Sequence, residues 1–237
     1  MKLTELTPSQ KVILSLFIVC LGVGFLVAQG HMFLTHRGSD GQPGLGLQDI
    51  KIAFAGDPES TRLKTYTLGS MAQHFSGDKE AQERLITWID DGAKEQTFEP
   101  IQQILDNYCT SCHHVGSGTP GADPLTSYEE VAALNRPDNR GPSLEHLARV
   151  SHIHLIPIAV MFLLAGLIFT GTAVGERWKV LVVSVAMLAV LSDVASWWLT
   201  RFVWREFAVL IGLSGALMGC TLAVMCLAGL ASMWRKR

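Results

Sequence analysis

The chain has 237 residues, of which 49% are hydrophobic, and its formal net charge at pH 7 is −2. This length fits one or two domains, and the lack of a basic patch excludes nucleic acid as a partner. The apolar residues are concentrated in four segments, 12–33, 154–174, 180–199 and 207–233. Each reaches the roughly 20 residues that a helix needs to cross a hydrocarbon core of about 30 Å. We therefore expect a membrane protein with four transmembrane helices.

The first apolar segment follows Lys2 and Lys11 and ends near small residues, a pattern that is also typical of a signal peptide. Its apolar run is long for a signal peptide, so we interpret residues 1–34 as a retained membrane anchor. The glycine-rich stretch that follows, 38–47, has the composition of a flexible linker.

The basic residues predict how the chain is oriented in the membrane. They flank the first apolar segment, separate the second from the third and follow the fourth: Lys2, Lys11, Arg177, Lys179, Arg235, Lys236 and Arg237. Because short loops rich in Lys and Arg remain in the cytoplasm, we expect both termini there. The polar stretch 35–151 then lies in the periplasm, and the chain is a multi-pass protein of a bacterial inner membrane.

The polar stretch is acidic. Residues 31–150 contain 17 acidic and 10 basic side chains. Such an excess either keeps a domain soluble or provides a docking face for a basic partner, with faster encounter at low salt.

Within the polar stretch, the sequence NYCTSCHHVG (residues 107–116) places a histidine directly after two cysteines that are three positions apart. A thioredoxin-like dithiol would need a βαβ context, which the flanking residues do not provide. A zinc site built from Cys109, Cys112, His113 and His114 would strain a tetrahedral shell on so short a loop, and no second Cys or His pair has finger spacing.

The third interpretation of this motif is covalent haem attachment. Two thiols at this spacing bond the two vinyl groups of a haem, and the following histidine becomes the proximal ligand of the iron. Cys109 and Cys112 are also the only cysteines of the polar stretch. We therefore predict one haem c on Cys109, Cys112 and His113, and we expect His114 on the surface.

The residues around the motif predict helices. Apolar residues recur at helical spacing in 98–107, which leads into the motif, and a second short helix follows with Ser127 as its N-cap. The stretch FEPIQQILDNYCTSCH, followed by PLTSYEEVAAL, resembles the first half of a small class I c-type cytochrome. The second half of such a domain resembles residues 56–93, which come earlier in this chain, so that the two halves are in permuted order.

The resemblance implies a membrane-anchored mono-haem c-type cytochrome. It places Met71 at the position of the distal iron ligand and Trp88 with Ile89 in the last helix of the cytochrome domain. His74, one turn further on, and a histidine from the membrane boundary are the alternative distal ligands. Ligation by His and Met gives a higher reduction potential than ligation by two histidines.

Histidines also gather near the expected outer membrane surface. His31 lies near the end of the first apolar segment, and His152 and His154 lie at the start of the second, where Ser151 is an expected N-cap. These histidines either anchor at headgroup depth or form a site. In the second case, His31 with His152 or His154 would hold a haem b, a metal or a quinone.

Asp193 lies in the outer half of the third apolar segment. A carboxylate inside a membrane is costly and indicates a functional site. We expect it to pair with His152, His154 or Arg201, either as a structural hydrogen bond or as the proton acceptor of a quinol site.

The expected architecture is mainly α, with an anchor (1–34), a small helical haem c domain in the periplasm (35–151) and a three-helix transmembrane region (152–237). The expected function is electron transfer within or beside a respiratory or other redox complex, rather than stand-alone catalysis. Its partners are then a redox protein, membrane lipid and further subunits. The alternatives are a quinol-oxidising cytochrome and a structural or sensory haem subunit.

Overall fold

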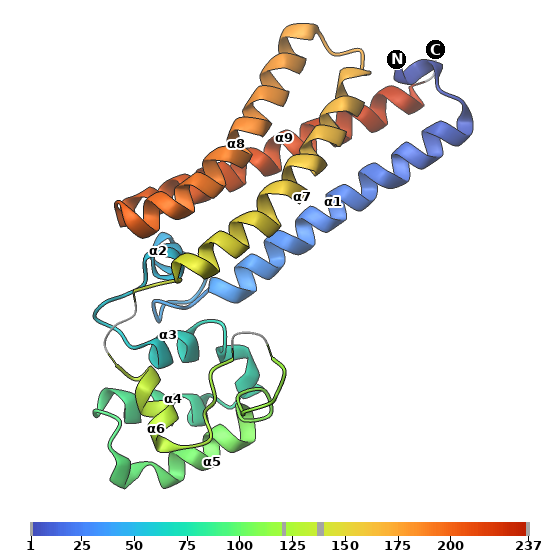
Figure 1. Cartoon of the computed structure of the whole chain (residues 1–237). Helices are drawn as coiled ribbons and strands as arrows, with labels where there is room; N and C mark the ends of the chain where they lie inside the picture. Colours follow the sequence, from blue (N-terminus) through green and yellow to red (C-terminus); the bar gives the residue numbers. More distant parts are fainter. Residues whose placement is uncertain (1, 120–121, 137–139, 236–237) are drawn as a thin grey trace. The chain divides into compact units, whose positions relative to one another are not determined.

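The computed structural model describes residues 2–119, 122–136 and 140–235. The described residues form helices and connecting turns, without a strand element, in two compact units (Figure 1). One unit comprises residues Met1–Met32 and Pro142–Arg237, and the other comprises Phe33–Gly141.

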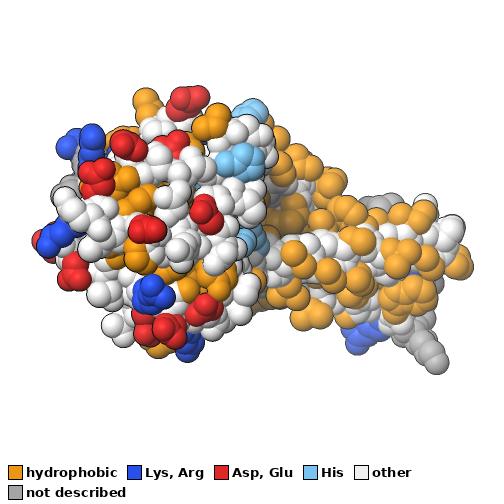
Figure 2. All heavy atoms as spheres, turned by 90° about the horizontal axis from the view of Figure 1, so that it is seen from below, with side chains coloured by type: hydrophobic (Ala, Val, Ile, Leu, Met, Phe, Trp, Pro, Cys, Tyr) orange, Lys and Arg blue, Asp and Glu red, His pale blue; other side chains and the backbone are white. Residues whose placement is uncertain are grey.

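Four long helices are apolar enough to cross a membrane, as the sequence predicts. They are α1 (Pro8–His36), α7 (Leu144–Thr170), α8 (Glu176–Phe202) and α9 (Ala208–Trp234). Large hydrophobic side chains such as Leu26, Leu163 and Leu188 are exposed on their outer faces. In Figure 2 these long helices are covered by hydrophobic side chains. Surfaces of this kind suit lipid, because hydrocarbon takes the place of water around them.

The core of the helical bundle combines large and small side chains. Phe162 and Phe169 of α7 pack with Ala186 and Val190 of α8 and with Met225 of α9. Alanine at these positions lets neighbouring helices approach closely, as is usual in membrane bundles.

The two termini and the loop between α7 and α8 lie at the same end of this bundle. Leu3 packs with Ile18 and Met233, and its backbone N–H donates to the carbonyl of Gly171 over 3.0 Å. Trp234 near the C-terminus donates its indole N–H to the Ser15 hydroxyl over 2.9 Å. The segments that carry most of the membrane-flanking Lys and Arg residues are therefore brought together.

Helix α7 begins earlier than we expected. Its N-cap is Ser143, whose hydroxyl accepts a hydrogen bond from the backbone N–H of His146, so the prediction of Ser151 as N-cap is wrong. Two more turns form because a capped helix continues through polar residues, and Leu147 in these turns is buried. Pro157 consequently lies inside α7, where it removes one backbone hydrogen bond.

The described part of the smaller unit contains seven short helical segments: α2 (Leu47–Ala55), α3 (Arg62–Leu68), the 3-10 turn η2 (Ala72–Phe75), α4 (Lys79–Asp90), the 3-10 turn η3 (Glu95–Thr97), α5 (Glu99–Tyr108) and α6 (Tyr128–Leu134). Its core contains Leu85, Trp88, Phe98, Leu105 and Val131. These residues come from both parts of the sequence that resemble the two cytochrome halves, so the two parts share one core.

Two local predictions in this unit are confirmed. The expected helix over 98–107 is α5, and Ser127 is the N-cap of α6. The Ser127 hydroxyl accepts from the backbone N–H of Glu130, while the Glu130 carboxylate accepts from the backbone N–H of Ser127, which is a capping box.

The glycine-rich segment 38–47, for which we predicted a flexible linker, forms turns that are hydrogen-bonded to the following helix α2. Asp49 is only 1% exposed, and its carboxylate accepts hydrogen bonds from the backbone N–H groups of Asp40 (3.1 Å) and Gly46 (2.7 Å). The buried carboxylate holds the glycine-rich segment in a defined loop, because the charge needs these donors once it is removed from water.

Candidate functional site

The cysteine motif directly continues helix α5. Cys109 is the C-cap residue of this helix, and its backbone N–H donates to the carbonyl of Leu105 over 2.7 Å. The chain then turns back on itself, since the N–H groups of Cys112 and His113 both donate to the carbonyl of Cys109, over 3.1 and 2.9 Å. Cys109 is half-buried, Cys112 is exposed, and both are free thiols. The motif is thus a compact turn that holds both thiols and His113 in order.

The ring of His113 is fixed by a backbone carbonyl. Its Nδ1 lies 2.7 Å from the carbonyl oxygen of Asp123, and the backbone N–H of Leu125 donates to the carbonyl of His113 over 2.9 Å. A carbonyl only accepts, so Nδ1 carries the proton and Nε2 presents its lone pair. Metal-ligating histidines usually have this second hydrogen bond, which sets the tautomer and the orientation of the ring.

Burial distinguishes Cys109 from a reactive dithiol. It raises the pKa of the Cys109 thiol to about 11, so that this side chain is a neutral thiol at pH 7. Redox-active dithiols instead have a thiol pKa lowered by nearby positive charge or a helix N-terminus. The environment of Cys109 therefore disfavours thiol–disulfide exchange.

The residues of the alternative zinc site do not form a converging group. Among the described residues, no three or more Cys, His, Asp or Glu side chains converge on a point where they would hold a metal ion. His114 is exposed, and its Nδ1 is directed to the carbonyl oxygen of Thr110 (2.8 Å) rather than to the thiols. A haem iron needs only His113 from this turn, because the porphyrin supplies four nitrogens.

The segment that contains Met71 and His74 packs against α5, the helix that leads into the motif. Met71 is half-buried at the start of η2, and His74 within η2 is exposed. Phe75, the last residue of η2, packs against the ring of Tyr108 at a centroid distance of 5.4 Å. Tyr108 directly precedes Cys109, so this segment contacts the end of α5 next to the motif.

A hydrogen bond that we did not predict strengthens this connection. The Tyr108 hydroxyl donates to the Asp78 carboxylate over 2.7 Å, and the same carboxylate caps α4 by accepting from the backbone N–H of Ala81. These bonds lower the pKa of Asp78, the N–H of Ala81 contributing most, and the bond to Asp78 raises the pKa of Tyr108. An aspartate directly before a helix is a recognisable N-cap signal in a sequence. The tyrosine partner of Asp78 lies 30 residues away, so the sequence does not reveal the bond between them.

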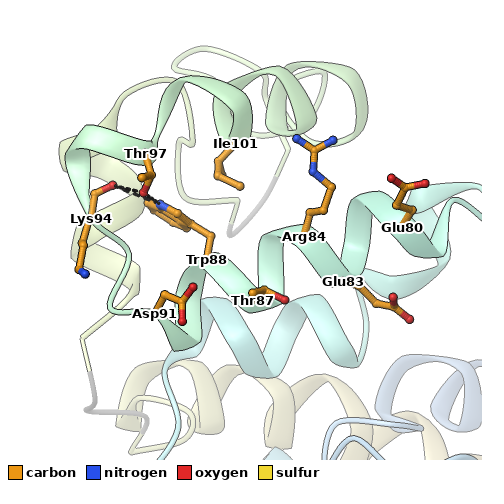
Figure 3. A pocket seen from close by; sticks show the side chains of 9 residues that line it. All are labelled: Glu80, Glu83, Arg84, Thr87, Trp88, Asp91, Lys94, Thr97 and Ile101. Carbon is orange, nitrogen blue, oxygen red and sulfur yellow. Dashed lines mark hydrogen bonds between the residues drawn. The ribbon is translucent and has the colours of Figure 1, made fainter.

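An open depression of about 710 Å³ lies between α4 and α5 (Figure 3), apart from the cysteine motif. Its lining residues are Glu80, Glu83, Arg84, Thr87, Trp88, Asp91, Lys94, Thr97 and Ile101. The indole N–H of Trp88 is already bonded to the Lys94 carbonyl and the Thr97 hydroxyl. This depression therefore presents mainly charged side chains, and none of the predicted haem ligands lines it.

The three membrane histidines of the sequence prediction differ in their described contacts. His31 on α1 and His152 on α7 are exposed, and no hydrogen bond or ring contact joins His31 to His152 or His154 in the described part of the chain. His154 is exposed as well, and its Nδ1 lies 2.8 Å from the carbonyl oxygen of Val150. A haem b held between His31 and one of the others stays a prediction.

Asp193 has a different partner from those we expected. It is 7% exposed, and the side chain of Trp197, one turn along α8, hydrogen-bonds its carboxylate. The ring of His154 packs edge-on against Trp197 at 5.6 Å. Arg201 instead donates its Nε to the carbonyl of Pro142 over 2.8 Å. The predicted pairing of Asp193 with Arg201 is wrong, because Arg201 lies two turns beyond Asp193, at the end of α8.

The long apolar helices define the class of the chain as a helical membrane protein. A family model described as a transmembrane helical domain matches residues 129–237, which include α7, α8 and α9. No curated protein and no solved structure matches the chain.

Proposed function

We propose that the chain is a membrane-anchored mono-haem c-type cytochrome that transfers electrons. Cys109 and Cys112 bind the haem covalently, and His113 is the proximal iron ligand. The observation that carries this proposal is the bond between His113 Nδ1 and the Asp123 carbonyl, which leaves Nε2 as the free ligand atom of a properly oriented ring.

The other residues of the turn have supporting roles. The bound haem supplies one-electron redox chemistry. The two thiols lie on one turn at the end of α5 and would hold the haem covalently. The buried side chains of Leu105 and Leu125 provide an apolar environment next to the motif. Such an environment would favour the less charged ferrous form of a bound haem, because the more charged ferric form loses more solvation.

We assign the distal position to Met71. It is half-buried, and its segment is held to the end of α5 by the contacts of Tyr108 with Phe75 and Asp78. His74 is the alternative ligand from the same segment, and its exposed ring fits an interior site less well than a thioether does.

The proposed location is the periplasmic face of a bacterial inner membrane, with both termini in the cytoplasm. Leu3, Gly171 and Trp234 lie at one end of the bundle. This supports the proposed orientation, because the Lys and Arg residues of these segments then lie on the same side of the membrane. Acidic side chains are spread over the smaller unit (Figure 2). They favour a basic redox protein as partner, within or beside a larger respiratory complex.

The test is haem staining after denaturing electrophoresis, together with a pyridine haemochrome spectrum. The wild-type chain should carry one covalent haem, and the double substitution Cys109→Ala with Cys112→Ala should carry none. Cys20→Ala with Cys220→Ala is the matched control, because both of these cysteines are exposed on the long helices. Covalent haem that survives the first double substitution, or an absence of haem from wild type matured in a host with cytochrome c assembly machinery, would overturn the proposal.

A further inference from the structure

A stripe of buried polar side chains runs along one face of α8. Asp193, Ser196, Trp197 and Thr200 are 7%, 0%, 7% and 2% exposed. Their spacing of three, four and seven residues places them on the same side of the helix. Polar groups inside a membrane-spanning helix are costly to bury unless they find hydrogen-bond partners. Those that are present therefore often belong to a structural or binding site.

Some polar groups of this stripe have hydrogen-bond partners, but one buried hydroxyl has none in the described part of the chain. The Ser196 hydroxyl donates to the backbone carbonyl of Asp193 over 2.6 Å, and Trp197 bonds the Asp193 carboxylate. The hydroxyl of Thr200 is buried and has no hydrogen-bond partner among the described residues. A buried donor without a partner costs about 1–3 kcal/mol, so Thr200 is suited to a ligand that supplies an acceptor.

His154 adds an acceptor beside the same stripe. Its Nδ1 must be the protonated nitrogen, because it faces the Val150 carbonyl, and Nε2 therefore presents a lone pair. The imidazole lies edge-on to the Trp197 indole, with an interplanar angle of 80°. Trp197 thus contacts an acceptor from α7 and a carboxylate from α8, and His154 is the exposed member of this group.

We propose that Asp193, Trp197, Thr200 and His154 bind the headgroup of a membrane quinone between α7 and α8. A quinone reaches this place from the bilayer, and its flat ring suits the indole. One ring oxygen accepts from Thr200, and the other, as the hydroxyl of the reduced form, donates to Asp193 or to Nε2 of His154.

The dimensions agree with this arrangement. Asp193 and Thr200 are seven residues apart, a rise of about 10.5 Å along the helix. A ring with oxygens at opposite ends and a hydrogen bond of about 2.8 Å at each end has a similar length. Nε and Nη2 of Arg205, in the turn that follows α8, are also buried and lack partners in the described residues. A lipid phosphodiester fits less well, because it has only acceptors and cannot donate to the Asp193 carboxylate or to Nε2 of His154.

Binding is measured with the full chain in lipid nanodiscs. The probes are a decyl-substituted benzoquinone and a naphthoquinone with the same side chain. Each probe is titrated into the nanodiscs, and the nanodiscs are then separated from unbound probe. We expect saturable binding of one of these probes, at one molecule per chain. His154→Leu should weaken it by about tenfold, which corresponds to the loss of one hydrogen bond. His152→Leu is the matched control, since His152 is an exposed histidine on another side of α7, and it should leave binding unchanged.

Thr200 provides a second test that is independent of His154. Thr200→Val keeps the shape of the side chain and removes its donor, so binding should again weaken, whereas Thr200→Ser should restore it. Three results would overturn the proposal: no saturable binding of either probe, equal effects of the His154 and His152 substitutions, or retention of anionic phospholipid at Thr200 in place of quinone. The chain with Cys109→Ala and Cys112→Ala should still bind the probe. Quinone binding is therefore tested independently of haem attachment.

Discussion

The hydroxyl of Tyr108 lies 2.7 Å from the carboxylate of Asp78, and this hydrogen bond joins segments 56–93 and 98–134, which the sequence analysis compared with the two halves of a c-type cytochrome. Asp78 caps α4 in the part that carries Met71, and Tyr108 ends α5 directly before Cys109. A second aromatic contact, between Trp88 and Phe98 at 5.7 Å, crosses the same boundary. The order of the two parts along the chain is therefore compatible with their packing as one unit.

The Asp78–Tyr108 pair predicts a pH-dependent contribution to stability. The folded-state pKa of Asp78 lies below the unfolded value of 3.8, so its contribution is present above that pH and is lost as the pH falls through the folded pKa. Asp78→Asn keeps an N-cap but removes the charge, and it should lower the Tm at pH 6 more than at pH 3. Thermal unfolding by circular dichroism measures this difference.

The control for this prediction is Asp106→Asn, since Asp106 is exposed on α5. It should shift the Tm little at either pH. A Tm difference between wild type and Asp78→Asn that stays constant from pH 6 to pH 3 would contradict the role of the charge.

The two neighbouring histidines of the motif should differ in their effect on the haem spectrum. His113→Ala removes the proposed proximal ligand and keeps both cysteines that would form the thioether bonds, so the haem should become high-spin. His114→Ala should leave the low-spin spectrum intact, because His114 is exposed and bonded to the Thr110 carbonyl. Absorption spectra of the reduced proteins distinguish these outcomes. Identical spectra for both variants would rule out His113 as the ligand.

The distal ligand is tested through the reduction potential. Met71→His should lower the midpoint potential strongly, because ligation by two histidines favours the ferric state relative to ligation by His and Met. His74→Ala should leave the potential unchanged. Spectroelectrochemical titration gives both values, and the opposite pattern would assign the ligand to His74.

The capping box of α6 should stabilise the smaller unit. Ser127→Ala removes the hydroxyl that accepts from the Glu130 N–H and should reduce the free energy of unfolding by about 1 kcal/mol. Glu129→Gln, a change at the exposed neighbour within the same helix, is the control and should alter stability by less than about 0.5 kcal/mol. Urea unfolding of the purified chain in detergent, followed by Trp fluorescence, measures both, and equal values would count against the capping role.

Gly229 should be sensitive to substitution because α1 packs closely on it. A Cβ at this position would lie 3.2 Å from Ile18 Cδ1 and 3.4 Å from Ile168 Cγ2. Gly229→Leu should therefore destabilise the bundle by about 1–3 kcal/mol through overpacking. Gly212→Leu in the same helix meets nothing within 4 Å and is the control. Thermal unfolding in detergent compares the two variants, and equal tolerance would show that α1 does not pack at Gly229.

The sequence alone determined the features that depend on local patterns. Four long apolar segments predict the four long helices, because a bilayer leaves a chain with few other ways to satisfy its backbone. The periodicity before the motif predicts α5, and the Ser127–Glu130 spacing predicts the cap of α6. The spacing of Cys109, Cys112 and His113 by itself points to haem attachment, because it matches the positions of the two vinyl groups.

Only the tertiary structure decided which distant side chains meet. It pairs Tyr108 with Asp78, directs His113 Nδ1 to the carbonyl of Asp123, and places Trp197 rather than Arg201 beside Asp193. It also begins α7 at Ser143 and folds the glycine-rich loop around Asp49. These outcomes depend on packing and on the partners that buried polar groups find, and neither can be read from the spacing of residues along the chain.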